Sequence, residues 1–243
     1  MIQENNNFDG ENVVFEAIKM EYRDMASWYD WFWGSYTAGT LKKPVNKVIM
    51  EQNDAMFTLV DVGSGTGEFL RLLKSHFFVD NKLQLTNGGQ KWISVEPSKE
   101  MMEEAQKKFP QGNDDIVSFK QSPAEKLPVD NSFADIVVST NAFHFFRNKE
   151  VALQEMKRVL KQDGKLIITD WCNDYWIVKL YHFMERLRWN WRFKDPYPGP
   201  LTKNELFQLA QNAGFANIRI SKYRVRVFAV FFWGMQTIVA EKE

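Results

Sequence analysis

Three glycines stand at alternate positions directly after an apolar run in the stretch LVDVGSGTGEFL, residues 59–70. Gly63, Gly65 and Gly67 leave the backbone bare, so this loop can lie closer to a ligand than a side chain would allow. The spacing is G-x-G-x-G, with Glu68 where the dinucleotide pattern G-x-G-x-x-G has glycine, and the loop lacks the lysine and hydroxyl residue of a phosphate-binding loop. The loop therefore favours an uncharged or cationic ligand over a dinucleotide or a triphosphate.

Two further segments carry polar side chains where we expect the chemistry to take place. STNAFHFF contains Asn141 and His144, and TDWCNDYW contains Asp170, Cys172 and Asp174. A histidine titrates near neutral pH and is the natural general base where a hydroxyl or an acidic carbon must lose a proton. We take His144 and Asn141 as the candidate catalytic residues; the alternative is a histidine simply packed in an aromatic loop. Cys172 has no evident activating partner and is expected to be inert packing.

These side chains must be positioned by strands and helices that alternate along the chain. Short runs of apolar residues predict strands, and apolar side chains at three- and four-residue spacing predict helices. The predicted strands are 57–62, 91–96, 116–121, 133–140, 165–171, 217–226 and 228–242. The predicted helices are 68–78, 98–109, 149–160 and 201–215, with a polar TNGG loop at 86–89 and a turn at 163–164.

This alternation predicts an α/β fold with a doubly wound, mostly parallel, seven-stranded sheet. The last two strands follow one another without a helix, so we expect an antiparallel hairpin at one sheet edge. The helix 201–215 carries a capping box in Thr202 and Glu205 and ends at Gly214. In such a sheet the ligand lies beyond the carboxyl ends of the strands, where both the glycine loop and His144 fall.

Composition narrows the class of protein. Lysine plus arginine and aspartate plus glutamate both total 31, so a net charge of zero gives no global attraction to nucleic acid. A single cysteine excludes an intramolecular disulfide and a cysteine-based zinc site, and we predict no metal site. The first residues contain no basic segment followed by an apolar one, and the longest apolar stretch, 227–235, is too short to span a membrane. We expect a cytoplasmic protein.

Four segments, in order, resemble the class I S-adenosylmethionine-dependent methyltransferases, in particular small-molecule methyltransferases with a type 11 domain. VDVGSGTGEF is similar to the family's first motif, VEPS to the acidic motif after its second strand, and SPAEKLPVDNSFADIV to its adenine-contacting segment. ALQEMKRVLKQDGKLIITD is similar to its late helix, turn and strand, so the resemblance covers about residues 57–242. It implies a Rossmann-like methyltransferase fold and S-adenosylmethionine as the cofactor.

The resemblance also implies which residues bind the cofactor. Asp61 would lie near the cofactor's amino group, a cation that favours a carboxylate neighbour. Glu96 would accept hydrogen bonds from both ribose hydroxyls, as a carboxylate can. Pro123 stands where the family often has an aspartate, and Ser122 or Glu125 can replace its contact with adenine. The implied cofactor-binding residues are Asp61, Gly63, Gly65, Gly67, Glu96, Pro97, Ala124, Glu125 and Asn141.

Two aromatic-rich segments outside these motifs are predicted to cover the strand ends as a lid. We predict an N-terminal helical lid segment at residues 1–55 and a methyltransferase core at residues 56–243, with 171–200 as a lid insertion. Aromatic side chains of the first segment can line a pocket for a planar or lipidic molecule or anchor the lid. They are Tyr22, Trp28, Tyr29, Trp33 and Tyr36.

The lid insertion contains a predicted helix with one apolar face and several basic residues. The apolar face consists of Ile177, Leu180, Met184, Leu187 and Trp191, and the basic residues are Lys179, Arg186, Arg188 and Arg192. We expect the apolar face to close on the core and the basic residues to be solvated. The alternatives are a helix on a membrane surface, or contact of its arginines and aromatics with bases or an acidic substrate.

The sequence therefore leaves three hypotheses. The first is an enzyme that moves a methyl group from S-adenosylmethionine to a small, aromatic or hydrophobic molecule. The family's frequent signature for amine methylation of nucleic acid is absent after the fourth strand, where STNAFHFF stands, which favours oxygen or carbon acceptors. The second is a methyltransferase acting on a lipid or RNA at the basic helix, and the third is a non-catalytic cofactor-binding protein. We expect a small-molecule partner, no nucleic acid and no transmembrane segment, with peripheral membrane contact left open.

Overall fold

Seven strands form one sheet in the order β3-β2-β1-β4-β5-β7-β6. The computed structural model describes residues 20, 22–51, 57–77, 91–109, 116–193, 198–227 and 231–243. The strands are β1 Thr58–Val62, β2 Lys91–Glu96, β3 Val117–Gln121, β4 Ala134–Thr140, β5 Leu160–Trp171, β6 Phe215–Val227 and β7 Phe231–Lys242. The first five pair in parallel, and β7 pairs antiparallel with both β5 and β6. The predicted seven-stranded α/β sheet with an antiparallel edge pair is confirmed.

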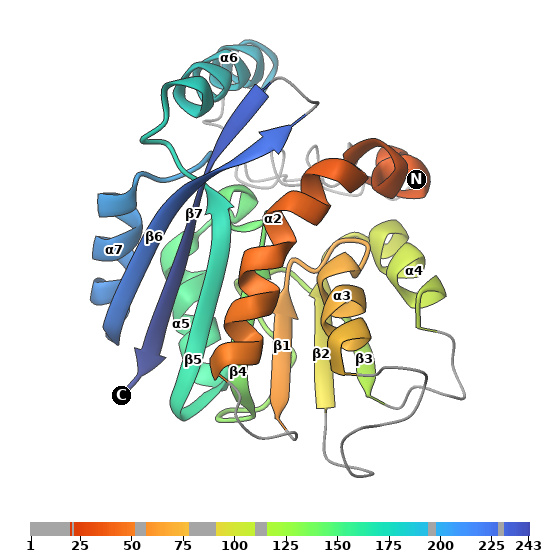
Figure 1. Cartoon of the computed structure of the whole chain (residues 1–243), viewed down its shortest axis with the longest axis vertical. Helices are drawn as coiled ribbons and strands as arrows, with labels where there is room; N and C mark the ends of the chain where they lie inside the picture. Colours follow the sequence, from red (N-terminus) through yellow and green to blue (C-terminus); the bar gives the residue numbers. More distant parts are fainter. Residues whose placement is uncertain are drawn as a thin grey trace, which may run out of the picture.

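Helices cover both faces of this sheet (Figure 1). The α-helices are α2 Tyr29–Glu51, α3 Glu68–Phe77, α4 Lys99–Lys107, α5 Lys149–Val159, α6 Trp176–Phe193 and α7 Lys203–Asn212, and the 3₁₀ helices are η1 Ala26–Trp28 and η3 Phe143–Phe145. Because side chains alternate along a strand, β1 contributes to both layers. Leu59 packs in the cluster that contains α2 and α3, whereas Val60 and Val62 pack in the cluster that contains α5 and α7.

Helix α2 has two different surroundings along its length. Its carboxyl-terminal half buries Leu41, Val45 and Val48 against the sheet, together with Leu59 of β1. Its first turns lie beyond the carboxyl ends of the parallel strands (Figure 1). One helix therefore reaches from the hydrophobic core to the edge where a ligand is expected.

Local capping signals in the sequence explain several helix ends. The Thr202 hydroxyl accepts from the Glu205 backbone N–H, and the Glu205 side chain accepts from the Thr202 N–H, which is the predicted capping box of α7. Gly214 follows this helix with a φ of 79°, as expected for its stop. The Ser98 side chain caps α4 and the Asn148 side chain caps α5 in the same way.

Two expectations are wrong, and two others fall wholly or partly outside the described residues. The predicted turn at Asp163 and Gly164 lies inside the continuous strand β5; Asp163 has a φ of 62°, and the register with β4 shifts between Ala134 and Ile136. The residues of β5 between Leu160 and Lys165 are more than those of β4 between Ala134 and Ile136, and they form a bulge in the ladder, so the strand does not end. The apolar face of α6 does not close on the core, as described below. The TNGG loop and residues 1–19 of the predicted lid lie outside the described residues.

Helix α6 turns a small part of its surface inward. Val178 is buried, and Tyr181 and Glu185 are largely covered. Leu180, Met184 and Leu187, by contrast, are exposed, whereas the side chain of Trp191 lies outside the described residues. Within the described ranges, no helix is long and apolar enough to cross a membrane.

Candidate cofactor and acceptor site

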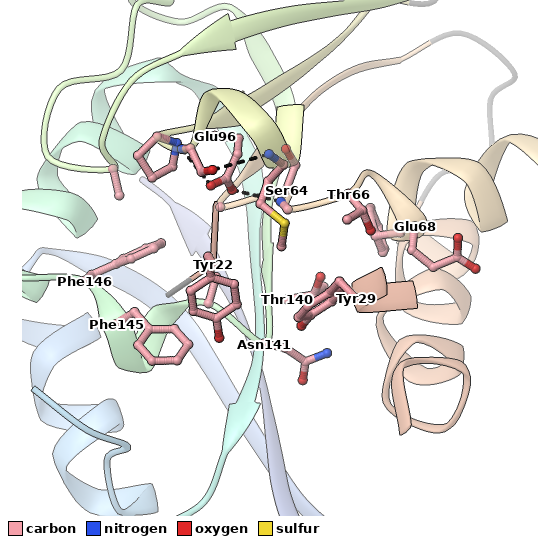
Figure 2. A pocket seen from close by; sticks show the side chains of 18 of the residues that line it. Tyr22, Tyr29, Ser64, Thr66, Glu68, Glu96, Thr140, Asn141, Phe145 and Phe146 are labelled. Atoms are coloured by element: carbon pink, nitrogen blue, oxygen red, sulfur yellow. Dashed lines mark hydrogen bonds between the residues drawn. The ribbon is translucent and has the colours of Figure 1, made fainter. Parts of the chain in front are cut away.

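A pocket opens at the carboxyl ends of β1, β2 and β4. It is bounded by the glycine loop after β1, the segment after β2, the loop after β3 and the segment after β4. Figure 2 shows Glu96 at one end of this pocket and Tyr29 and Asn141 toward the other. Among the predicted cofactor-binding residues, the pocket is lined by Gly63, Gly65, Glu96, Pro97, Ala124, Glu125 and Asn141.

The glycine loop is fixed by backbone hydrogen bonds to the end of β2. The N–H groups of Gly63 and Ser64 both donate to the carbonyl of Val95, at 2.8 and 3.2 Å. Gly63 has a φ of 72°, and a Cβ there would lie 2.6 Å from the Cβ of Ala142. This position therefore requires glycine on two grounds, backbone conformation and space.

Gly67 serves packing within the fold. It does not line the pocket; it has a φ of 73°, and a Cβ there would lie 3.0 Å from the Cβ of Ala105 in α4. Its N–H donates to the Ser64 carbonyl at 2.9 Å, which closes the turn into α3. The structure thus separates Gly67 from Gly63 and Gly65, which face the pocket.

Glu96 is held in place by the loops on either side of it. One carboxylate oxygen accepts from the Gly65 N–H at 2.9 Å and the other from the Ser98 N–H at 3.0 Å (Figure 2). Burial raises the pKa of Glu96 to about 7, although these two hydrogen bonds oppose the rise. Each oxygen keeps a further lone pair, so the carboxylate can accept hydrogen bonds from a ligand in the pocket.

Asp61 lies behind the pocket, inside the sheet. It is fully buried, does not line the pocket, and neither carboxylate oxygen has a hydrogen-bond partner among the residues that the structure describes. Burial, and secondarily the charge of Glu96, raises the pKa of Asp61 well above its ordinary value. Buried carboxylates are normally paired, so this one calls for a donor or a cation nearby.

A second, aromatic pocket adjoins the first. Both pockets are lined by Tyr22, Tyr29, Asn141 and Phe145. The second is also lined by Met25, Trp33, Tyr36, His144, Trp171, Tyr181, Glu185 and Arg188. Four of the five N-terminal aromatics predicted to line a pocket do so; Trp28 is exposed instead.

His144 lies in the wall of this aromatic pocket, paired with Asp170. Its Nδ1 is 2.6 Å from Asp170 Oδ1, and its backbone N–H donates to Asp170 Oδ2, also at 2.6 Å. Asp170 Oδ1 accepts in addition from the Trp171 N–H at 2.7 Å. Because the Asp170 carboxylate can only accept hydrogen bonds, the ring proton of His144 is assigned to Nδ1. His144 Nε2 then carries a lone pair, and it has no partner among the described residues.

The surroundings of His144 restrict the ring further. The ring stacks on Trp171 with centroids 4.2 Å apart and lies 3.9 Å from the ring of Phe145. The Lys149 ammonium donates to the carbonyls of His144 and Phe146, at 3.4 and 3.2 Å. This cation secures the short η3 turn on which His144 stands; burial lowers the pKa of Lys149 to about 8.

Asn141 stands between the two pockets, and both the nitrogen and the oxygen of its side-chain amide are hydrogen-bonded. Its Nδ2 donates to Thr40 Oγ1 at 2.8 Å, and its Oδ1 accepts from the Tyr36 hydroxyl at 3.2 Å. Both partners belong to α2, and Asn141 itself has a φ of 55°. The amide therefore connects the strand end to the helix that covers it.

Of the other candidates from the sequence, Cys172 and Asp174 have structural partners. Cys172 is buried, its thiol lies 3.6 Å from Asp174 Oδ2, and burial raises its pKa to about 11. Asp174 forms an ion pair with Lys222 at 2.9 Å. A thiol with a raised pKa is a poor nucleophile, in agreement with the predicted inert packing.

The sequence reasoning missed the pairing of His144 with Asp170 and the aromatic wall from β5 and α6. The pairing depends on β4 and β5 being neighbours, with Thr140 opposite Thr169 in their register, and the sequence alone does not give this order. Residues that directly follow two paired strands meet at the same edge of the sheet. Phe145, Trp171 and Tyr181 carried no comparable spacing signal.

The pockets fit the cofactor that the resemblance implies. Glu96 has acceptor capacity for two hydroxyl groups, the glycine loop gives close backbone approach at Gly63, and the partnerless Asp61 carboxyl behind the loop favours a cationic group. A nucleoside with two ribose hydroxyls and positive charge matches all three features. Within the described parts of the chain, no group of three or more His, Cys, Asp or Glu side chains could hold a metal ion.

Comparison with known proteins agrees with this geometry. Residues 60–168 match the family model described as a methyltransferase domain. An uncharacterized methyltransferase-like protein of Schizosaccharomyces pombe is 29% identical over 60% of this chain and 54% of its own length. The chain thus spans about half the length of that relative. The ubiquinone/menaquinone biosynthesis C-methyltransferase of Campylobacter jejuni is 22% identical over 78% of this chain and 83% of its length.

A solved structure extends the likeness to the fold. The SAM-dependent methyltransferase of Thermotoga maritima, described as a possible histamine N-methyltransferase, superposes with a TM-score of 0.68 and 20% identity. The superposition covers 95% of this chain and all of that one. The motif order, the sheet topology and the matched domain lead to one conclusion. Residues 60–168 form a methyltransferase domain, in a chain with the fold of the class I S-adenosylmethionine-dependent methyltransferases, whose cofactor is S-adenosylmethionine.

Proposed function

We propose that this chain transfers a methyl group from S-adenosylmethionine to a small, aromatic or hydrophobic acceptor at an oxygen or an acidic carbon, with His144 as the general base. The observation that carries the proposal is the buried Nε2 of His144, which has no hydrogen-bond partner among the described residues and lies in the wall of an aromatic pocket that adjoins the cofactor pocket. The cofactor supplies a methyl group on a cationic sulfur. The residues of the chain hold the acceptor against it.

In the proposed arrangement, Gly63, Gly65 and Glu96 hold the nucleoside, and Asp61 stabilises positive charge from behind the loop. The aromatic pocket orients a planar acceptor by stacking and excludes water, and positioning of this kind contributes several kcal/mol. His144 Nε2 accepts the proton that the acceptor oxygen or carbon gives up, while Asp170 keeps the ring in the required tautomer. A well-placed base of this type is worth about 10²- to 10⁴-fold in rate.

The names of similar proteins support this proposal in different degrees. The Campylobacter relative is named as a C-methyltransferase of ubiquinone and menaquinone biosynthesis, which favours a carbon acceptor on a hydrophobic aromatic molecule. The Thermotoga structure is named as a possible histamine N-methyltransferase, so amines belong among the acceptors tested.

The first experiment is thermal unfolding with S-adenosylmethionine, its demethylated product and NAD, for wild type and Glu96→Ala. A ligand at 100 times its dissociation constant stabilises the fold by about 2.7 kcal/mol, which gives a clear shift in the midpoint. We expect the first two ligands to stabilise wild type, and the shift to vanish in Glu96→Ala. A shift with NAD instead would overturn the cofactor assignment.

The second experiment identifies the acceptor. Wild type and His144→Ala are incubated with methyl-labelled S-adenosylmethionine and a panel of phenols, quinols, acidic-carbon compounds and amines. We expect label on oxygen or carbon with wild type and at least about tenfold less with His144→Ala. Label on amines alone contradicts the acceptor class, and cofactor binding without labelled product from any acceptor favours a non-catalytic protein.

A further inference from the structure

Helix α6 carries a row of large apolar side chains on its solvent side. These side chains, called the α6 stripe below, are Trp176, Leu180, Phe183, Met184 and Leu187, and they are between 47% and 70% exposed. Their spacing of three and four residues places them on one face of the helix. The opposite face contributes Tyr181 and Glu185 to the aromatic pocket. The helix is amphipathic, but its larger apolar face points away from the protein.

Further apolar side chains are exposed on the other side of the same pocket. Trp28 of η1 and Trp31 and Phe32 at the start of α2 are exposed, Trp31 to 85%. Neighbouring residues of this segment, Tyr29 and Trp33, line the aromatic pocket opposite α6. Figure 1 shows α6 and the start of α2 at the same end of the molecule, where the parallel strands finish. Exposed apolar surface therefore flanks the pocket on two sides, more than scattered single residues would give.

The charges next to the α6 stripe are mostly positive. Lys179, Arg186 and Arg188 belong to the helix, and Arg224 of β6 lies over the ring of Tyr175 just before it. Among residues 176–188 the one acidic side chain is Glu185, which is largely covered and paired with Arg188 at 2.8 Å. An apolar face bordered by cations is the pattern of a helix that lies in a membrane interface with anionic headgroups.

We propose that the α6 stripe, with Lys179 and Arg186, docks the protein on the surface of an anionic phospholipid bilayer. A second copy of the chain is a poorer occupant, because a two-fold interface on this helix would bring the same cations face to face. Docking by this face lays α6 between the bilayer and the aromatic pocket, because the opposite face of the helix contributes Tyr181 and Glu185 to the pocket wall. On the proposed function, this brings the pocket close to a hydrophobic acceptor dissolved in the lipid phase.

The test is cosedimentation of the full chain with phosphatidylcholine vesicles that contain or lack phosphatidylglycerol. The variant Met184→Gln/Leu187→Gln removes two exposed apolar side chains of the α6 stripe. Met50→Gln/Val151→Gln is the matched control, because these residues are also exposed apolar side chains on helices, α2 and α5. We expect wild type and the control to bind the anionic vesicles, and the stripe variant to partition at least about tenfold less.

A second pair of variants examines the charge. Lys179→Gln/Arg186→Gln should lower binding to anionic vesicles by about fivefold for each charge removed, whereas Lys42→Gln/Lys91→Gln, with the same change in net charge, should not. Each variant is checked for its thermal shift with S-adenosylmethionine, which separates this proposal from that of the proposed function. Equal binding by the stripe variant and its control overturns the proposal. The proposal is also overturned if wild type is a dimer and the stripe variant a monomer in sedimentation velocity, because a second copy of the chain would then occupy the α6 stripe.

Discussion

Asp170 holds His144 at two points, with one carboxylate oxygen 2.6 Å from the ring Nδ1 and the other 2.6 Å from the backbone N–H. One carboxylate thus fixes both the position of the residue and the direction of its ring. Because Asp170 accepts, the ring nitrogen that faces away from it is left as the acceptor. In the proposed function, this relationship orients His144 to act as a base before any substrate binds.

The first prediction concerns this pair. His144→Ala should lower turnover by at least about tenfold and leave S-adenosylmethionine binding unchanged, because the base acts only on the acceptor. Asp170→Asn should also lower kcat by about tenfold or more with little change in KM for the cofactor, since the amide no longer enforces the tautomer. The measurements are steady-state kinetics and calorimetric titration of the cofactor.

Chemical rescue separates a base from a packing residue. Imidazole added to the buffer should restore part of the turnover of His144→Ala, because the cavity left by the ring admits it. Loss of activity without rescue, together with loss of cofactor binding in the same variant, would mean that His144 supports the fold of the loop and does not take a proton.

The second prediction concerns the glycine loop. Gly63→Ala should lower the free energy of unfolding by about 1–3 kcal/mol, because its φ of 72° is unfavourable for alanine and the new Cβ would lie 2.6 Å from that of Ala142. Gly34→Ala is the matched control: this glycine lies in α2, and a Cβ there meets nothing within 4 Å. Alanine should stabilise that helix by up to about 1 kcal/mol. Urea unfolding measures both, and similar effects at the two positions would refute the specific requirement for glycine at position 63.

The third prediction concerns pH. Burial raises the pKa of Glu96 from 4.5 to about 7, so the folded protein binds a proton here that the unfolded chain releases at lower pH. The stability that this proton contributes is fully present below about pH 4.5 and is lost as the pH rises through about 7, a difference on the order of 3 kcal/mol. Unfolding free energies measured from about pH 5 to about pH 8 should fall less steeply in Glu96→Gln than in wild type.

Cofactor binding should depend on pH in the opposite direction. Donors from the ribose hydroxyls favour the ionised carboxylate, so affinity for S-adenosylmethionine should rise as the pH increases toward about 7, by at most about tenfold per pH unit. An affinity that stays flat over this range in wild type would mean that Glu96 is already ionised in the free protein.

Local sequence signals predicted most of the framework. The capping box at Thr202 and Glu205 and the stop at Gly214 were found at their expected places, because each depends on a few adjacent residues. Alternation along the chain was enough to predict the mostly parallel sheet and its antiparallel edge. The predicted turn at Asp163 and Gly164 lies inside β5, because the strand resumes its pairing with β4 and β7 at Lys165 after residues 161–164, which pair with neither.

What the sequence could not supply depends on contacts between distant elements. Periodicity indicated that α6 has an apolar face but not which side of the helix meets the protein; Val178 and Tyr181 lie inward, whereas Leu180 and Met184 are exposed. The pairing of His144 with Asp170 requires the order of β4 and β5 in the sheet, which no local pattern specifies. Most residues of the cofactor pocket could be predicted, because they directly follow strands. The residues of the aromatic pocket could not.

The last prediction concerns Tyr36, whose hydroxyl connects Trp171 and Asn141 in the wall of the aromatic pocket. It accepts from Trp171 Nε1 at 2.5 Å and donates to Asn141 Oδ1 at 3.2 Å. Tyr36→Phe leaves the indole N–H without this acceptor, which should cost about 1–3 kcal/mol of stability. Because Trp171 stacks on the His144 ring, the loosened indole should also lower turnover while cofactor affinity stays nearly constant.

Tyr223→Phe is the matched control for this prediction. Its hydroxyl lies 3.2 Å from Thr237 Oγ1, and the residue lines neither pocket. Removing this neutral hydrogen bond should cost only about 0.5–1.5 kcal/mol and leave turnover unchanged. Urea unfolding and steady-state kinetics on both variants give the comparison. If both tyrosines lower turnover equally, the effect arises from general loosening of the β6 and β7 region, and Tyr36 has no special part in holding the wall of the aromatic pocket.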